Sequence, residues 1–237
     1  MSAEISEHPD HPVKWPVMFQ GWTALTFLHW PYQPEAIQAL LPAGLELDTF
    51  DGSAWIGLTP FLLTGLRAPL LPALPWISCF PEMNVRTYVR SGGERGIWFF
   101  SLEAARAAAV AGARLAYALP YRWAAMSVRF DAKQVEYSSR RHFGIGSAHI
   151  FVRREAPIKA NALERFLTAR FRLYTKIAGR LAFAQVEHEP WPLESASIEH
   201  LEQDVIQNSS LPAPAEDPLV HFSPGVYVRV GRPRLVR

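Results

Sequence analysis

The sequence predicts an α+β fold, a mainly antiparallel curved β-sheet or barrel with three or four flanking helices. Three observations predict this fold. Short stretches of alternating polar and apolar residues recur along the chain, and turn sequences such as Asp51-Gly52 separate them. The 237 residues include 20 prolines, which break helices and interior strands. Few segments have helical spacing, so strands outnumber helices by roughly nine or ten to three or four.

The individual elements follow from periodicity and from turn or capping residues. Strands are expected over residues 22–29, 45–50, 54–63, 82–90, 96–100, 124–130, 134–137, 148–153, 181–188 and 226–230. Helices are expected over residues 34–41, from Ser101 towards Arg114, over 160–174 and over 197–207. Ser101 is a plausible N-cap, and Glu103 places an acid in the first turn of that second helix.

The segment 82–90 is the most informative strand candidate. Successive strand side chains point to opposite faces. One face then carries a polar row of Glu82, Asn84, Arg86, Tyr88 and Arg90, and the other face is mostly apolar. A polar row on a strand of an otherwise apolar region indicates side chains that are paired with one another or that line a cavity.

The domain organisation is expected to be simple. No repeat or low-complexity linker divides the chain, so we expect a flexible tail over residues 1–14 and a single domain over 15–237. The start of the chain lacks the basic and apolar regions of a secretory signal. The most apolar region, 53–80, contains four prolines and Arg67, which argues against a membrane span. We therefore expect a cytoplasmic protein.

Composition excludes several functional classes. The charged fraction is 19%, the hydrophobic fraction is 49% and the net charge is +2, which argues against disorder and against a dedicated nucleic-acid-binding protein. The single cysteine, Cys79, excludes an intrachain disulfide framework and multi-cysteine metal motifs. No phosphate-binding loop, zinc-protease motif or serine nucleophile elbow is present. We therefore expect no metal, cofactor or nucleic acid partner.

A second group of polar residues follows the polar row in the sequence. Glu103 and Arg106 would lie one turn apart on the expected helix and are able to pair. Several arginines near a cavity favour an anionic ligand, because guanidinium binds carboxylate in a bidentate fork. The alternative is that Glu103 pairs with an arginine only to tie helix to sheet. The remaining candidates in this group are Arg114, Tyr117, Tyr121 and Arg122.

Several segments resemble a known family. The sequences at 48–55, 84–89, 98–104, 119–121 and 186–193 are similar to those of the YqjF-like bacterial family of unknown function, and the resemblance extends over residues 15–230. That family is grouped by fold with acetoacetate decarboxylase-like proteins. The resemblance therefore implies an antiparallel barrel or cone with helices around a central pocket.

The wider resemblance fails at the residues that perform decarboxylation. Acetoacetate decarboxylases carry a Gly-Arg-Glu run and then a Pro followed by two lysines, the first of which forms a Schiff base. Here Arg114 and Pro120 match, but Leu115 replaces the glutamate, and Tyr121 and Arg122 replace the two lysines. Neither side chain forms an imine, so the sequence predicts that this protein is not an imine-type decarboxylase.

Our hypothesis is a pocket protein that binds a small anionic or carbonyl-bearing molecule, with acid–base or lyase-type chemistry left open. Tyr121 and Glu103 are the candidate proton carriers. The candidate ligand-binding residues are Asn84, Arg86, Arg106, Arg114, Tyr117 and Arg122. The alternative is a non-enzymatic binding or interaction protein, such as a homo-oligomer, that uses the apolar loop 68–76 and a basic surface. The loop itself is expected to be a lid, an interface or plain packing.

Overall fold

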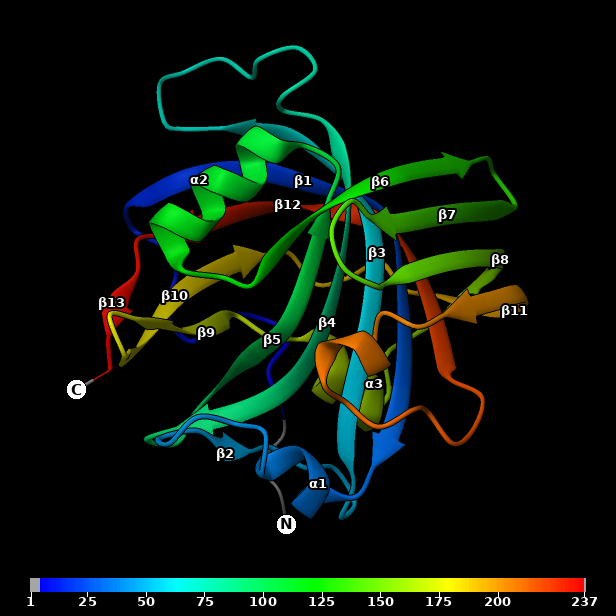
Figure 1. The fold of residues 1–237 in the computed structure, drawn as a ribbon, viewed down its shortest axis with the longest axis horizontal. Coiled ribbons are helices and arrows are strands. Elements are labelled where there is room, and N and C mark those ends of the chain that lie inside the picture. The colour runs from blue at the N-terminus through cyan, green and yellow to red at the C-terminus, as the bar shows by residue number, and fades with distance from the viewer. Residues whose placement is uncertain (1–4, 237) are drawn as a thin grey trace.

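The structure is a computed structural model that describes residues 5–236. Within these residues thirteen strands form one sheet, and three α-helices and one 3₁₀ turn complete the fold (Figure 1). The strands are β1 (Pro16–Tyr32), β2 (Glu46–Leu47), β3 (Ala54–Arg67), β4 (Phe80–Ser91), β5 (Glu94–Ala104), β6 (Tyr121–Phe130), β7 (Gln134–Arg141), β8 (Ser147–Pro157), β9 (Arg172–Ile177), β10 (Arg180–His188), β11 (Glu194–Gln203), β12 (Leu219–Gly231) and β13 (Arg234–Leu235). The helices are α1 (Pro34–Gln38), α2 (Ala107–Tyr117) and α3 (Ala162–Thr168), and the turn is η1 (Gln207–Ser209).

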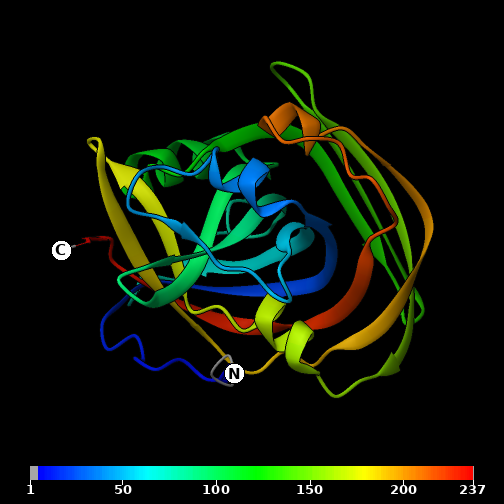
Figure 2. The same cartoon turned by 90° about the horizontal axis from the view of Figure 1, so that it is seen from below.

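The sheet closes on itself twice. The order β5-β6-β7-β8-β11-β12-β1-β3-β4 is closed by pairing of β4 with β5, which makes a barrel that we call the nine-strand barrel. Pairing of β10 with β12 closes a second ring, β10-β9-β5-β4-β3-β1-β12, which we call the seven-strand lobe. The curvature of the sheet is visible from below in Figure 2. Only the pairings of β5 with β6 and with β9 are parallel, so the predicted mainly antiparallel, curved sheet is confirmed.

Strands β12, β1, β3, β4 and β5 belong to both rings and form a partition between them. Because successive strand side chains alternate, the partition gives one set of residues to each side. On β4, Met83 and Val85 lie in the core of the nine-strand barrel, whereas Glu82, Asn84 and Arg86 face the seven-strand lobe. The nine-strand core is filled by large apolar side chains, among them Trp30, Ile56, Tyr137, Ile150 and Phe222.

The helix predicted from Ser101 begins later than expected. β5 continues to Ala104, with Ser101 paired opposite Val85 and Glu103 opposite Met83, and α2 begins only at Ala107. Pairing with β4 overrides the local N-cap and alanine signals, because it places Leu102 and Ala104 in buried positions. The expected helical pair of Glu103 with Arg106 therefore does not exist.

Two other helix predictions also need correction. Residues 194–203 form β11 rather than a helix, because this segment pairs with β8. The helix predicted over 160–174 is limited to α3, which begins at an Asn161–Glu164 capping box. The following segment turns and enters β9 at Arg172, which pairs with β10.

The predicted tail over residues 1–14 falls partly outside the described residues. Within the described part, Val13 is buried, and its backbone N–H donates to the Glu187 carboxylate over 2.6 Å. The tail and the single domain remain predictions. No helix within residues 5–236 is long and apolar enough to cross a membrane.

Candidate functional site

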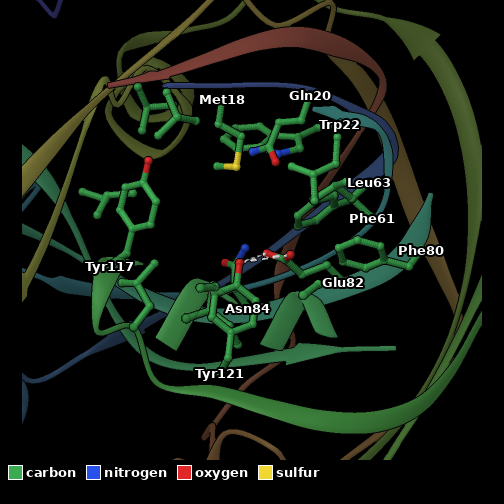
Figure 3. A pocket seen from close by; sticks show the side chains of 18 of the residues that line it. Met18, Gln20, Trp22, Phe61, Leu63, Phe80, Glu82, Asn84, Tyr117 and Tyr121 are labelled. Atoms are coloured by element: carbon green, nitrogen blue, oxygen red, sulfur yellow. Dashed lines mark hydrogen bonds between the residues drawn. The ribbon is translucent and has the colours of Figure 1, made fainter. Parts of the chain in front are cut away.

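The seven-strand lobe encloses a cavity of about 680 Å³. Its walls come from β1, β3, β4, β5, β9, β10, β12 and the start of β6, and its cover comes from α2 and the loop between β3 and β4. We call residues 68–79 the β3–β4 loop. Figure 3 shows Glu82, Asn84 and Tyr121 on one wall, with Met18, Gln20 and Trp22 opposite them. A volume of this size lies within the range of sites that hold drug-sized ligands, ~300–1,000 Å³.

The polar row predicted on residues 82–90 forms part of this wall. Glu82, Asn84 and Arg86 are all buried and all line the cavity. They belong to the central part of β4, which is hydrogen bonded to β3 on one side and to β5 on the other. The strand pairings therefore hold these three side chains on one rigid surface, as the alternation predicted.

Glu82 and Tyr121 form a hydrogen-bonded pair on the cavity wall. The Tyr121 hydroxyl donates to the Glu82 carboxyl, with Oε1 and Oε2 at 3.2 and 3.1 Å. Burial raises the pKa of Glu82 to about 8, although the hydrogen bond from Tyr121 opposes this rise. Burial and the nearby Glu82 also raise the pKa of Tyr121. Both groups therefore hold a proton at neutral pH, and the pair is uncharged.

Arg86 supplies a positive charge to the deep end of the cavity. Its Nη2 donates to the Leu167 carbonyl over 3.2 Å, and its guanidinium lies 5.3 Å from the Phe27 ring centroid. Among the described residues, no carboxylate lies within ion-pair distance of Arg86, and its Nε has no partner. A buried charge is stable only when it is paired or hydrogen bonded, so this side chain is suited to an anionic ligand.

Two histidines beside Arg86 remain neutral. Burial lowers the pKa of His29 well below its usual value, with a further contribution from Arg86. Burial likewise lowers the pKa of His188 to about 4. The His29 ring contacts the Tyr88 hydroxyl at 2.6 Å, and His188 Nδ1 lies 2.7 Å from the Glu189 carbonyl. These rings therefore add no positive charge at neutral pH.

Arg170 also lines the cavity, but it is paired with a carboxylate, which it shares with Arg90 and Arg95. It forms a buried ion pair with Asp48 at 2.7 Å and lies over the Phe166 ring.

Several side chains around the cavity have a buried polar atom without a hydrogen-bond partner. These atoms are Trp22 Nε1, Thr59 Oγ1, Asn84 Oδ1, Arg86 Nε and Arg170 Nη2. Unpartnered buried polar atoms are costly, and here all five belong to residues that line one cavity.

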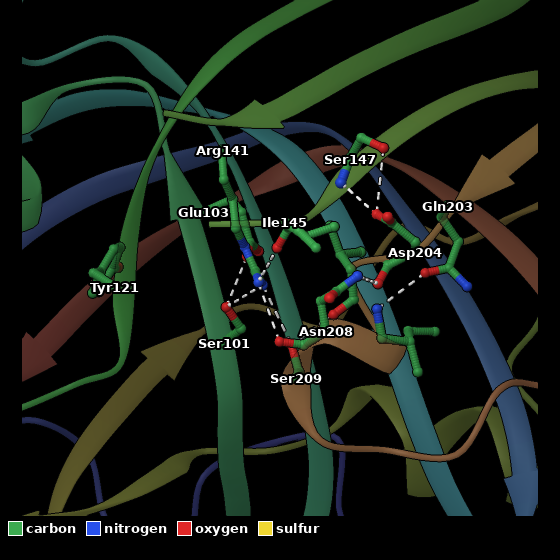
Figure 4. A network of polar contacts seen from close by, with 12 residues as sticks. Ser101, Glu103, Tyr121, Arg141, Ile145, Ser147, Gln203, Asp204, Asn208 and Ser209 are labelled. Carbon is green, nitrogen blue, oxygen red and sulfur yellow. Dashed lines mark hydrogen bonds and ion pairs between the residues drawn. The ribbon is translucent and has the colours of Figure 1, made fainter. Parts of the chain in front are cut away.

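Glu103 does not line the cavity, contrary to expectation. It lies on the opposite face of β5, where Ser101 Oγ donates to it at 2.7 Å and Arg141 Nη2 pairs with it at 2.5 Å. Arg141 also donates to the carbonyls of Ile145 and Asn208. Figure 4 shows this network, with Tyr121 apart from it. This geometry agrees better with the alternative interpretation, in which Glu103 forms a structural ion pair with an arginine. The pair connects β5 with β7, however, and not a helix with the sheet.

Strand register explains this separation. In the parallel pairing of β5 with β6, Tyr121 is level with Leu102 and Arg122 is level with Glu103. Leu102 and Tyr121 face the cavity, so Glu103 and Arg122 face the other side. Arg122 is exposed and lines a separate small depression with Trp123. Arg122 therefore does not line the cavity, and its ligand-binding role stays a prediction.

The other three candidates from the sequence support the cover of the cavity. Arg106 is the N-cap residue of α2, and its Nε donates to the Trp76 carbonyl over 3.0 Å. Arg114 donates to the Tyr121 carbonyl from outside. Neither arginine lines the cavity, in contrast to our expectation. Tyr117 does line it, and its hydroxyl donates to the Gly231 carbonyl.

Sequence reasoning missed Arg170 and His188 as cavity residues, and it did not list Glu82 among the candidate catalytic or ligand-binding residues. Glu82 was recognised only as part of the polar row, and its row position is the signal that identifies it. Arg170 and His188 come from segments far from β4 in sequence, and no local pattern marks them. Within residues 5–236, no three His, Cys, Asp or Glu side chains are grouped as a metal site.

The geometry excludes a lysine nucleophile in this cavity. The chain has four lysines, Lys14, Lys133, Lys159 and Lys176, and none of them is among the cavity-lining residues. Tyr121, which the sequence resemblance aligns with a lysine of acetoacetate decarboxylases, lines the cavity. An imine mechanism therefore has no nucleophile in the cavity.

Comparison with known proteins gives the family and the fold. The uncharacterised conserved protein family DUF2071 matches residues 19–227. The uncharacterised protein YqjF of Bacillus subtilis (strain 168) is 40% identical over 211 residues, which are 87% of each chain. The enduracididine biosynthesis enzyme MppR, complexed with the condensation product of pyruvate and imidazole 4-carboxaldehyde, has a TM-score of 0.67 at 15% identity, over 93% of this chain and 88% of that one. Acetoacetate decarboxylase from Legionella pneumophila has a TM-score of 0.66 at 15% identity, over 100% and 92% of the two chains. The chain therefore belongs to the uncharacterised DUF2071 family, and its fold is that of the acetoacetate decarboxylase-like proteins.

Proposed function

We propose that the cavity binds a small oxo acid, a molecule with a carboxylate and a nearby carbonyl group. The observation that carries the proposal is Arg86, a buried guanidinium that faces the cavity and has no carboxylate partner among the described residues. Since Glu82 is neutral at pH 7 and Arg170 is paired with Asp48, Arg86 is a buried positive charge that no carboxylate of the described residues offsets. A ligand carboxylate at the Arg86 guanidinium balances this charge.

The neutral Glu82–Tyr121 pair supports the second part of the proposal, that the ligand carries a carbonyl oxygen. A protonated carboxyl with a pKa of about 8 donates its proton to such an oxygen near neutral pH. The Tyr121 hydroxyl then donates its hydrogen bond to the carboxylate that remains on Glu82. Glu82 thus serves as the general acid and Tyr121 as its hydrogen-bond donor. Glu103 has no part in this step.

The fold neighbours support the same class of ligand. MppR has also been described in a complex with pyruvate, a 2-oxo acid, and its structure is similar to this chain at 13% identity. Such a likeness shows fold alone, so the ligand of this chain rests on its own residues. The absence of lysine from the lining points to proton transfer on a carbonyl or enol rather than to imine chemistry.

A binding experiment with two arginine variants tests the proposal. Wild-type protein is titrated with a panel of 2- and 3-oxo acids, and binding is followed by thermal shift and calorimetry. We expect Arg86→Met to weaken binding by about 100-fold, because it removes a charge-assisted bidentate contact. The matched control is Arg129→Met, which removes an exposed guanidinium on β6. No binding of any oxo acid by wild-type protein, or equal binding by Arg86→Met, would sink the proposal.

A second candidate function, self-association, is favoured by the β3–β4 loop. Leu70, Leu71, Leu74 and Trp76 are all exposed, and apolar side chains grouped in this way often mark an interface. Light scattering of wild-type and Trp76→Ser proteins tests it. An oligomer that dissociates in the variant, with unchanged oxo acid binding, supports an interface. A monomer in both cases rejects this candidate.

A further inference from the structure

The two ends of the cavity differ in chemical character. The deep end carries Arg86, Asn84 and Thr59, whose unpartnered polar atoms are buried. The other end lies beneath α2 and the β3–β4 loop, where most lining side chains are apolar and Arg67 and Ser78 are the polar ones beside the loop. An oxo acid of three or four carbons occupies only the polar end. The rest of the 680 Å³ then has no ligand group to fill it.

The inner face of α2 explains why this volume is empty. The α2 residues on the cavity are nearly all small, and they are Ala108, Ala109, Gly112, Ala113, Ala116 and Tyr117. A Cβ atom added at Gly112 would meet no atom within 4 Å. A helix that covers a hydrophobic space usually fills it with large side chains. Here the cover is apolar but leaves the space open.

The β3–β4 loop closes the same end with apolar side chains. Leu71, Pro72, Leu74 and Ile77 all line the cavity. Ser78 holds the base of the loop, since its hydroxyl donates to the Leu66 carbonyl and accepts from the Leu74 backbone N–H. The wall that faces the ligand beyond its polar end is therefore hydrocarbon from both the loop and the helix.

We infer that the ligand is an amphipathic acid, with its carboxylate at Arg86 and a long apolar chain that runs along α2 and beneath the β3–β4 loop. This inference rests on the proposed function for the polar end and adds the substrate class. Arg86, which has no carboxylate partner among the described residues, fixes the carboxylate, and the alanine and glycine face of α2 supplies a channel for methylene groups. The partly exposed Leu71 and Leu74 cover the distal carbons.

Affinity should then depend on chain length. Burying one CH₂ group contributes about 0.8 kcal/mol, which corresponds to a three- to fourfold change in Kd. The Kd of 2-oxo acids should therefore fall about three- to fourfold for each added carbon, until the cavity is full, and then stay constant. Trp22 and Trp191 stack at 5.9 Å and both line the cavity, so their fluorescence is a direct measure of occupancy.

The experiment titrates straight-chain 2-oxo acids of three to fourteen carbons, and in parallel n-alkanols of the same lengths, into wild-type, Ala113→Phe and Ala111→Phe proteins. Ala113 lines the cavity, whereas Ala111 is an exposed residue of the same helix that does not. We expect Ala113→Phe to weaken the longest acids at least tenfold and to leave pyruvate unchanged. Ala111→Phe should bind the whole series as wild type does.

The outcomes separate this inference from the proposed function. If wild-type protein binds pyruvate and binds the longer acids with the same affinity, the inference is overturned and the proposed function stays in place. Binding of alkanols with the expected length dependence but of no oxo acid overturns the proposed function, and with it the carboxylate part of the inference. Length dependence of the acids supports both, and the wild-type series decides even if Ala113→Phe fails to fold.

Discussion

The nine-strand barrel and the seven-strand lobe share five strands but have opposite interiors. The barrel is filled by large apolar side chains such as Trp30 and Tyr137, and its buried Glu103 is paired with Arg141. The lobe holds a cavity, and its Arg86 has no carboxylate partner among the described residues. The shared partition accounts for the polar side chains that face the lobe, because residues alternate between its two sides. The open volume arises from the elements that cover each side, since β7 and β8 carry bulky residues and α2 carries alanine and glycine.

The buried ion pair gives the largest predicted contrast between the two interiors. Arg141→Met should lower the free energy of unfolding by about 3–5 kcal/mol, because it leaves the Glu103 carboxylate buried without its cation. Arg86→Met should change it by less than about 1 kcal/mol, since no charged partner is stranded. Urea unfolding followed by circular dichroism measures both values.

A double variant controls for lost packing at Arg141. Glu103→Leu combined with Arg141→Met removes both charges, and we expect it to recover part of the loss. Equal losses for the two arginine variants would mean that Arg86 has a structural partner in the lobe. The contrast between the paired Arg141 of the barrel and Arg86 of the lobe would then be wrong.

A matched pair of leucines tests whether the lobe is hollow. Leu28 is fully buried in the nine-strand core, whereas Leu63 lines the cavity. Leu28→Ala should cost about 3–5 kcal/mol, because the loss of apolar contact adds to a new void. Leu63→Ala should cost about 2 kcal/mol or less, because it only widens a space that already exists. Thermal and urea denaturation check both values, and a larger loss for Leu63→Ala would contradict an open cavity.

The sequence was sufficient for the fold class, for most strands and for the polar row on β4. Alternation over residues 82–90 predicted correctly that Glu82, Asn84 and Arg86 share a face. It did not predict how β5 would continue that face. Between Val85 and Arg86 the register with β5 shifts, so that Arg86 lies opposite Phe99 rather than Phe100.

Such register details decide which residues reach the site. Leu102 faces the cavity and Glu103 does not, a one-residue difference set by pairing between strands. The sequence predicts that the strand ends at residue 100, whereas β5 extends to Ala104 for a related reason. Ser101 and the alanines after it favour a helix locally, but pairing with β4 extends the strand. Arg141 and Arg170 reach their buried partners from distant strands and loops, and local patterns carry no information on such contacts.

The raised pKa of Glu82 predicts a pH dependence that belongs to the lobe. Its folded pKa of about 8 exceeds the usual value of 4.5, so the folded state holds this proton more tightly than the unfolded state. Its contribution to stability is therefore complete below pH 4.5 and is lost as the pH rises towards 8. Between pH 5 and 7, wild type should lose up to about 2–3 kcal/mol relative to Glu82→Gln, which does not titrate.

Denaturation of both proteins across pH 5–8 measures this difference. Tyr121→Phe serves as a second probe, because loss of its hydrogen bond should raise the pKa of Glu82 further and move the effect to higher pH. Identical pH profiles for wild type and Glu82→Gln would show that Glu82 is charged at neutral pH. In that case the charge balance used to assign an anionic ligand would fail.

The smallest predicted effect concerns the space that α2 leaves open. Gly112→Ala should raise the free energy of unfolding by about 0.5–1 kcal/mol, because alanine favours the helix and its Cβ meets nothing within 4 Å. Gly57→Ala, at the deep end of the same lobe, should lower it, because a Cβ there would lie 3.1 Å from His29 and 3.3 Å from Arg86. Thermal denaturation distinguishes the two signs. Gly112→Ala is then compared with wild type for binding of long-chain acids. Weaker binding by the variant would show that glycine at this position lowers helix stability but keeps the cavity open. The open interior of the lobe would then be due to the residues of α2 that cover it.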